Sequence, residues 1–97
     1  MTIEKTNDNG SFLIVLEGRL DTTTAPGLEA ELKDLDGIEK LTFDFEKLEY
    51  ISSAGLRVLL AAQKAMDKQG SLVVRNVNET IMEIFEVTGF NDILSIE

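Results

Sequence analysis

Two adjacent hydroxyl side chains, Ser52 and Ser53, are the residues of this chain best placed to do chemistry. The residues that follow them open a run of strong helix formers: Ala54, Gly55, Leu56 and Arg57. A serine at such a junction lies over the free backbone N–H groups and the positive end of the helix dipole, where a phosphate is stabilised. Gly55 has no side chain, and we expect it to let another molecule approach the first turn closely. Serine is also a preferred N-cap residue, so the pair by itself marks a helix start more often than a site.

Few other residues of this sequence could support catalysis. The chain has no His and no Cys, which excludes imidazole bases, thiol nucleophiles, disulfides and structural zinc. An enzyme that uses carboxylates alone stays formally possible. The acidic pairs that could serve it are spaced two apart and are expected to be solvated surface: Asp34 with Asp36, and Asp44 with Glu46. We therefore predict a protein that is not an enzyme and has no metal or cofactor.

Length and charge limit the partners that this protein can have. The chain has 97 residues and a net charge of -9, and 43% of its residues are apolar. That length suits one domain over residues 1–97 with a single core. The negative charge repels phosphate backbones and anionic lipids, so nucleic acid is not expected as a partner. We see no leading signal and no apolar run long enough to span a bilayer, and therefore expect a cytoplasmic protein without direct membrane insertion.

The elements that position the serine pair alternate along the chain. A hairpin is predicted from strands at residues 2–6 and 12–16, the second covered on both faces. An amphipathic helix with Pro26 in its first turn and Leu28, Leu32 and Leu35 on its apolar side ends at Gly37, and a strand at 41–45 is followed by a turn at 46–50. A helix at about 53–69 leads to a strand at 71–77. Asn78 caps a third helix that Gly89 ends, and an apolar tail at 90–97 docks as a short last element.

This order predicts an α/β domain. Strands separated by helices imply right-handed crossovers, a mixed sheet of four to five strands and helices packed mainly on one face. The serine pair then lies where a strand passes into the second helix. The class of fold does not by itself determine the function.

Three segments of the sequence carry a resemblance to a known family: Gly18-Arg19-Leu20-Asp21, residues 51–60, and residues 85–90. Together, and over nearly the whole chain, they resemble the bacterial anti-sigma factor antagonists, which are stand-alone STAS domains. The resemblance implies a STAS-like fold and a partner switch. In that family the unphosphorylated antagonist binds an anti-sigma factor serine kinase and frees a sigma factor. The kinase then phosphorylates the antagonist, which releases it, and a metal-dependent serine phosphatase resets the cycle.

The resemblance also implies which residues act. Aligned on Gly55-Leu56, it puts the phosphoacceptor at Ser53 and an acidic residue beside it at Asp21. The implied partner-binding residues form two segments: Asp21, Thr22, Thr23 and Thr24, and Ser52, Ala54, Gly55, Leu56 and Arg57. We expect charge reversal at Asp21 to weaken partner binding while leaving stability nearly unchanged. The best-known members have Asp before the acceptor and a second hydroxyl residue after it, where this chain has Ser52 and Ala54.

Two alternatives stay open beside the antagonist. Some STAS domains are non-phosphorylated adaptor subunits of transport or lipid-trafficking complexes. Small acidic domains can also carry a prosthetic group on a serine at a helix N-terminus. Such carriers are helical bundles, and the strand segments of this chain disfavour that interpretation.

Overall fold

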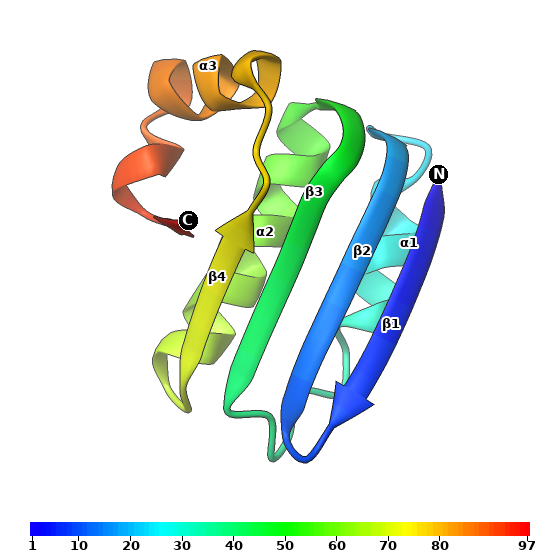
Figure 1. Ribbon diagram of the computed structural model, residues 1–97, viewed down its shortest axis with the longest axis vertical. Coiled ribbons are helices and arrows are strands. Elements are labelled where there is room, and N and C mark those ends of the chain that lie inside the picture. The colour runs from blue at the N-terminus through cyan, green and yellow to red at the C-terminus, as the bar shows by residue number, and fades with distance from the viewer.

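A single mixed β-sheet forms the centre of the molecule (Figure 1). A computed structural model describes residues 1–97. The five strands are β1 (Thr2–Asp8), β2 (Ser11–Leu20), β3 (Lys40–Ile51), β4 (Ser71–Arg75) and β5 (Ser95–Ile96), and they lie in the order β1-β2-β3-β4-β5. β1 pairs antiparallel with β2, and the other neighbours are parallel. The predicted hairpin and mixed sheet are confirmed.

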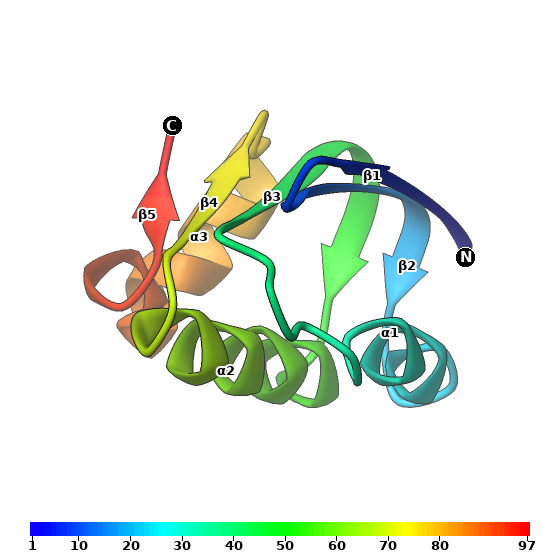
Figure 2. The same cartoon turned by 90° about the horizontal axis from the view of Figure 1, so that it is seen from below.

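The helices connect the parallel strands. They are α1 (Ala25–Glu31), α2 (Ser53–Asp67) and α3 (Glu79–Thr88), and a short 3₁₀ turn, η1 (Phe90–Asp92), leads into β5. Figure 2 shows α1 and α2 side by side on one face of the sheet. The predicted fold class, an α/β domain with helices mainly on one face, is therefore confirmed. None of these helices is both long and apolar enough to cross a membrane.

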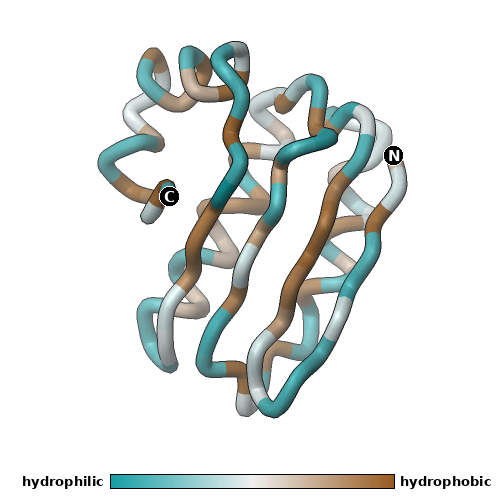
Figure 3. Tube along the Cα trace, in the orientation of Figure 1, coloured by the Kyte–Doolittle hydropathy of each residue, from teal (hydrophilic) through white to brown (hydrophobic).

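β2 is covered by helices on one face only, so the prediction that both faces are covered is wrong. Its alternate residues Phe12, Ile14 and Leu16 are buried, whereas Leu13 and Val15 between them are half-buried. Figure 3 shows the resulting apolar stretch of β2 beside the largely polar edge strand β1. Leu13 and Val15 lie on the other face of the strand, between paired residues of β1 and β3.

β3 is longer than predicted, and the turn expected at residues 46–50 is wrong. The strand continues to Ile51, because Leu48 and Ile51 both point into the core with 1% exposure. The pairing with β2 shifts register twice, between Val15 and Glu17 and between Gly18 and Arg19. Such bulges bend a strand and interrupt its apolar alternation, and the sequence pattern then looks like a turn.

α1 is shorter than predicted, since it ends at Glu31 and not near Gly37. Leu35 is nevertheless buried, in the turn that follows the helix. The side-chain amide of Gln69, just after α2, donates to the carbonyl oxygens of Leu35 and Ile38 and holds this turn in place. The ammonium group of Lys5 lies 3.2 Å from the Glu31 carboxylate, which fixes the end of α1 to the edge strand.

The last third of the chain follows the prediction closely, except that β4 ends at Arg75 and not at residue 77. Asn78 accepts a 2.9 Å hydrogen bond from the backbone N–H of Ile81 and caps α3. Gly89 ends α3 with a left-handed φ of 81°. The tail then docks as predicted, because Leu94 is buried and β5 pairs with β4.

Candidate functional site

The two segments singled out in the sequence meet at one end of the sheet. Leu20 and Ile51 are paired at the carboxyl ends of the parallel strands β2 and β3. The backbone N–H of Ser52 donates a 2.9 Å hydrogen bond to the carbonyl oxygen of Leu20. β2 leads from there into the loop that begins at Asp21, and β3 leads into α2. Ligand and partner sites of α/β sheets are common at this edge, outside the carboxyl ends of the strands.

The two serines are not equivalent. Ser53 is the first residue of α2 and is exposed to solvent. Ser52 is the N-cap residue, with an extended backbone, and its carbonyl oxygen accepts the N–H of Leu56 at 2.9 Å. The hydroxyl of Ser52 is buried without a hydrogen-bond partner and makes no cap bond. Ser53 is therefore the hydroxyl that another protein can reach.

The loop after β2 is held by the carboxylate of Asp21. Its Oδ1 atom accepts hydrogen bonds from the backbone N–H of Thr23 at 2.9 Å and from the Thr23 hydroxyl at 2.6 Å. The hydrogen bonds from Thr23, aided by the nearby charge of Arg19, lower the pKa of Asp21 below its ordinary value of 3.8. Because this carboxylate orders its own loop, we now expect its charge reversal to lower stability as well as partner binding.

Thr24 completes the same loop from the inside. Its hydroxyl donates to the carbonyl oxygen of Arg19 at 2.8 Å and accepts the backbone N–H of Asp21 at 2.9 Å. Thr22 and Thr23 remain exposed on the rim. Thr24 thus fixes the loop from the inside, Thr23 is exposed but also bonds to Asp21, and Thr22 is exposed.

A groove runs from this loop along the helices. Thr22 and Arg57 line an open hollow of about 290 Å³ between the start of α1 and the start of α2. Ala54 and Val58 lie on its α2 side, and Pro26 and Glu29 on its α1 side. The loop segment and the α2 segment therefore present side chains to the same groove.

Gly55 and Leu56 play a different part from the one expected. Gly55 is buried, and a Cβ atom there would lie within 3.0 Å of side-chain atoms of Leu20 and Ile51. Leu56 is 6% exposed and belongs to the core. The glycine lets α2 approach the sheet and does not open the first turn to another molecule, so that expectation is wrong. The exposed residues of the α2 segment are Ser53 and Arg57.

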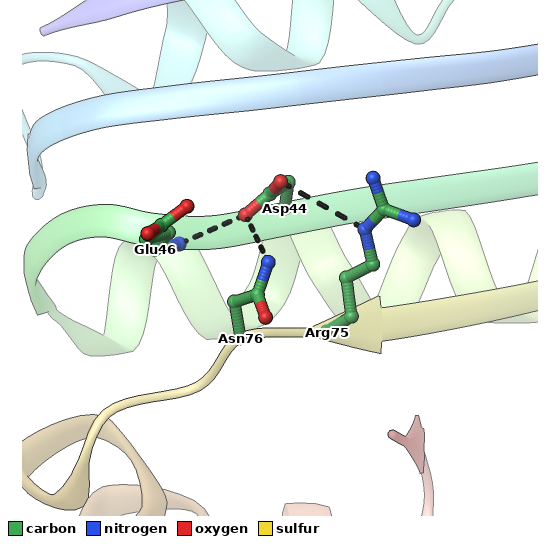
Figure 4. Close-up of polar contacts among 4 residues, drawn as sticks. All are labelled: Asp44, Glu46, Arg75 and Asn76. Atoms are coloured by element: carbon green, nitrogen blue, oxygen red, sulfur yellow. Dashed lines mark hydrogen bonds and ion pairs between the residues drawn. The ribbon is translucent and has the colours of Figure 1, made fainter.

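Asp44 belongs to a second polar cluster, on the face of the sheet that no helix covers (Figure 4). Its Oδ1 atom accepts the side-chain amide of Asn76 and the backbone N–H of Glu46, both at 3.0 Å, and Arg75 lies 3.7 Å from Oδ2. Partial burial raises the pKa of Asp44, but these hydrogen bonds and the charge of Arg75 outweigh it and leave the pKa lowered. Asp44 therefore joins β3 to the end of β4. No three carboxylates of the chain gather as metal ligands.

Tyr50, near the end of β3, has a partner that the sequence did not reveal. The guanidinium of Arg19 lies 4.5 Å from the centre of the Tyr50 ring, a cation–π contact across the ends of β2 and β3. A cross-strand pair depends on register, and the two register shifts between β2 and β3, each with one extra residue in β3, set that register. No feature of the sequence alone would have found it.

The comparisons with known proteins follow this geometry. Residues 4–95 match the family model described as "Mlab, STAS domain". The "Putative anti-sigma factor antagonist BtrV" of Bordetella bronchiseptica is 37% identical over 99% of this chain and 84% of its own length. The chain belongs to the STAS domain family of anti-sigma factor antagonists. These are non-enzymatic regulators, in agreement with the prediction that the protein is not an enzyme.

More distant relatives agree. The anti-sigma-B factor antagonist of Staphylococcus aureus is 28% identical over 99% of this STAS domain and 92% of its own length. The crystal structure of an anti-sigma factor antagonist from Mycobacterium paratuberculosis superposes with a TM-score of 0.87 at 23% identity, over 98% of this chain and 83% of that one. At that identity the structural likeness shows the fold alone. The resemblance found in the sequence is confirmed at the level of the family.

Proposed function

We propose that this STAS domain is an anti-sigma factor antagonist that binds an anti-sigma factor serine kinase and thereby frees a sigma factor. The observation that carries the proposal is the exposed hydroxyl of Ser53 at the start of α2, one residue beyond the hydrogen bond that joins the ends of β2 and β3. Identities of 28% and 37% to curated antagonists, over nearly the whole chain, favour this function over an adaptor in a transport complex. Such a regulator acts in the cytoplasm.

The proposed switch is phosphorylation of Ser53. The kinase transfers the γ-phosphoryl group of ATP to Oγ of Ser53, so that a new O–P bond forms while the bond to the β-phosphate oxygen breaks. ADP leaves, and the hydroxyl proton passes to a base of the kinase. The chain itself contributes the acceptor hydroxyl and a helix N-terminus, which favours an added anion by about 0.3–1 kcal/mol. The fold therefore tolerates the phosphate.

The same phosphate weakens binding to the anti-sigma factor. It adds roughly 1.5 to 2 negative charges to a surface whose chain already has a net charge of -9. In a closely apposed interface its oxygens lose water and must find donors in the partner. The phosphorylated antagonist then dissociates, and a metal-dependent serine phosphatase returns it to the binding form. Exposure of Ser53 serves both the kinase and the phosphatase.

Reconstitution tests the proposal. The domain is mixed with the complex of sigma factor and anti-sigma factor kinase from the same genome, with ADP in place of ATP. Size-exclusion chromatography should then show the domain bound to the kinase and the sigma factor free. Adding ATP should release the domain. Failure of the domain to bind the kinase, together with binding to a transporter subunit in the same assay, would favour the adaptor.

A further inference from the structure

The groove between α1 and α2 extends well beyond the Ser53 end. A second hollow of about 140 Å³ continues it along the two helices. The two hollows share Glu29 and Val58, so together they form one groove that is open to solvent. The residues of the second hollow are mostly apolar: Glu29, Leu32, Lys33, Leu35, Val58, Ala61, Ala62 and Ala65.

The groove exists because α1 and α2 differ in length. α1 has seven residues and α2 has 15, so on the side that faces α1 the second half of α2 lies beside the turn after α1 and not beside a helix. Short alanine side chains face Leu32 and Leu35 across this gap. Figure 2 shows the two helices side by side beneath the sheet, with the short α1 next to the long α2. From Ala54 to Ala65 the groove follows about 16 Å of helix, which matches three turns of another helix.

Charge along α2 distinguishes one side of this groove. Arg57, Lys64 and Lys68 are exposed at spacings of seven and four residues, which places them on one side of the helix and its C-cap. None of the three takes part in a salt bridge, since the two ion pairs of the chain involve Lys5 and Arg75. Asp67 is the single acidic residue between 53 and 68.

The surroundings of this basic stripe (Arg57, Lys64 and Lys68) are acidic. Residues 29–39 contain five acidic residues and one lysine, and residues 79–97 contain five acidic residues and no basic one. Carboxylates of a partner that face residues 29–39 or 79–97 therefore meet net repulsion, whereas carboxylates along α2 meet unpaired cations. Charge complementarity of this kind sets register and excludes other partners.

We propose that the groove receives a helix of the anti-sigma factor, with an apolar ridge that fills the hollow and carboxylates on the flank that faces Arg57, Lys64 and Lys68. The inference rests on the proposed function and deepens it, because it names a second contact that begins beside Ser53 and leads away from it. Helix-in-groove recognition uses apolar anchors spaced three and four residues apart, and the groove has the length for three turns.

A second copy of the chain fits the groove less well. The α3 helix of a second copy has the acidic side chains that the basic stripe would attract: Glu79, Glu83 and Glu86. The apolar side of α3, however, is already used, because Ile81 and Phe85 are buried in its own core. An anionic membrane is opposed by the net charge of -9.

The test compares two double charge reversals that change the net charge equally. Lys64→Glu with Lys68→Glu alters the groove flank, and Lys40→Glu with Lys47→Glu alters exposed lysines of β3 that make no salt bridge. Affinity for the anti-sigma factor kinase of the same genome is measured by calorimetry with ADP, and folding by circular dichroism. The groove variant should bind at least tenfold more weakly, and the β3 variant should change affinity less than threefold. Ala61→Phe, which fills an exposed position of the groove, should also bind at least tenfold more weakly.

Each other outcome decides against the inference in a recognisable way. If the wild-type chain does not bind the kinase, the proposed function fails with it. If the wild-type chain binds and the groove variants bind equally well, the proposed function stands and the groove is not the contact. Equal weakening by both charge reversals would indicate a net-charge effect alone. A wild-type dimer in sedimentation that the groove variants abolish, or binding to phosphatidylglycerol vesicles, would assign the groove to another occupant.

Discussion

A Cβ atom at position 55 would lie 2.7 Å from Cγ of Leu20, so α2 packs on the end of β2 at a distance that only glycine permits. The same atom would lie 2.8 Å from Cγ1 of Ile51, the last residue of β3. Leu20 and Ile51 are paired, and the chain enters the Asp21 loop and α2 immediately after them. Gly55 therefore fixes how closely Ser53 lies to the sheet edge and to the Asp21 loop.

Gly55→Ala should destabilise the fold by about 1–3 kcal/mol, because the added methyl group overpacks the junction. Helix propensity alone would favour alanine by about 1 kcal/mol, so the sign of the change reports the packing. Gly27→Ala in α1 is the matched control, since nothing lies within 4 Å of a Cβ atom there. Urea unfolding should show loss of stability for the first variant and a small gain for the second. A gain for both would refute the packing argument.

Asp44→Asn should change the dependence of stability on pH. The folded pKa of Asp44 lies below its ordinary value of 3.8, so its charge stabilises the native state above that pH, and this contribution is lost as the pH falls through the folded pKa. The variant should be less stable at pH 7 by up to about 1 kcal/mol, because its ion pair with Arg75 is lost. The difference should shrink as the pH falls below 3.8 and through the folded pKa of Asp44. Urea titrations at several pH values test this, and a constant difference would argue against it.

Asn78 should contribute to stability through both ends of its amide. Its Oδ1 atom caps α3, and its Nδ2 atom donates to the carbonyl oxygen of Leu48 at 2.8 Å. Asn78→Ala should cost about 1–2 kcal/mol, and Asn78→Ser should cost less because serine keeps the cap. Thermal denaturation of the three proteins gives the order. Equal loss in both variants would mean that the Leu48 bond, and not the cap, carries the effect.

Two substitutions of Asp21 should separate the effect of its charge on partner binding from its effect on the structure of the loop. Asp21→Asn keeps an oxygen that can accept from the N–H and hydroxyl of Thr23, so its melting temperature should stay close to that of the wild type. Its affinity for the anti-sigma factor should still fall if the charge contacts the partner. Asp21→Lys should lose both stability and affinity. An Asp21→Asn variant with full affinity would restrict this residue to ordering the loop.

Much of the fold follows from local signals that the sequence carries directly. The hairpin turn at Asn9-Gly10, the Asn78 cap and the Gly89 helix end each act within a few residues, and the predicted hairpin, cap and helix end all occur. The serine pair could be located for the same reason, because α2 begins where its helix formers begin. Local chemistry determines these features, and the rest of the molecule does not override it.

The missed features all depend on residues far apart in the chain. The bulges that let β3 continue to Ile51 arise from pairing with β2, and the sequence of β3 alone suggests a turn. A glycine at position 55 suggests from sequence an open first turn of α2. In the structure Leu20 and Ile51 fill the space around it. The difference between Ser52 and Ser53 is likewise one of burial, which adjacent hydroxyls cannot reveal. Register and packing decide these points.

Phosphorylation of Ser53 should act on the complex and not on the fold. Ser53→Asp should unfold at nearly the wild-type temperature, because a negative charge is favoured at the start of α2. It should bind the anti-sigma factor about two orders of magnitude more weakly, as expected for a loss of roughly 3 kcal/mol. Ser53→Ala should fold and bind well. Calorimetry on the three proteins tests the contrast, and full affinity of Ser53→Asp would speak against an electrostatic switch.

Mass spectrometry after incubation with the anti-sigma factor kinase and ATP tests the central claim most directly. The wild-type chain and Ser52→Ala should each gain one phosphate on Ser53, because the Ser53 hydroxyl is exposed and that of Ser52 is buried. Ser53→Ala should gain none. Phosphate on Ser52 alone would overturn the assignment of the acceptor, and no phosphate on either serine, from a kinase that binds the domain, would contradict the switch.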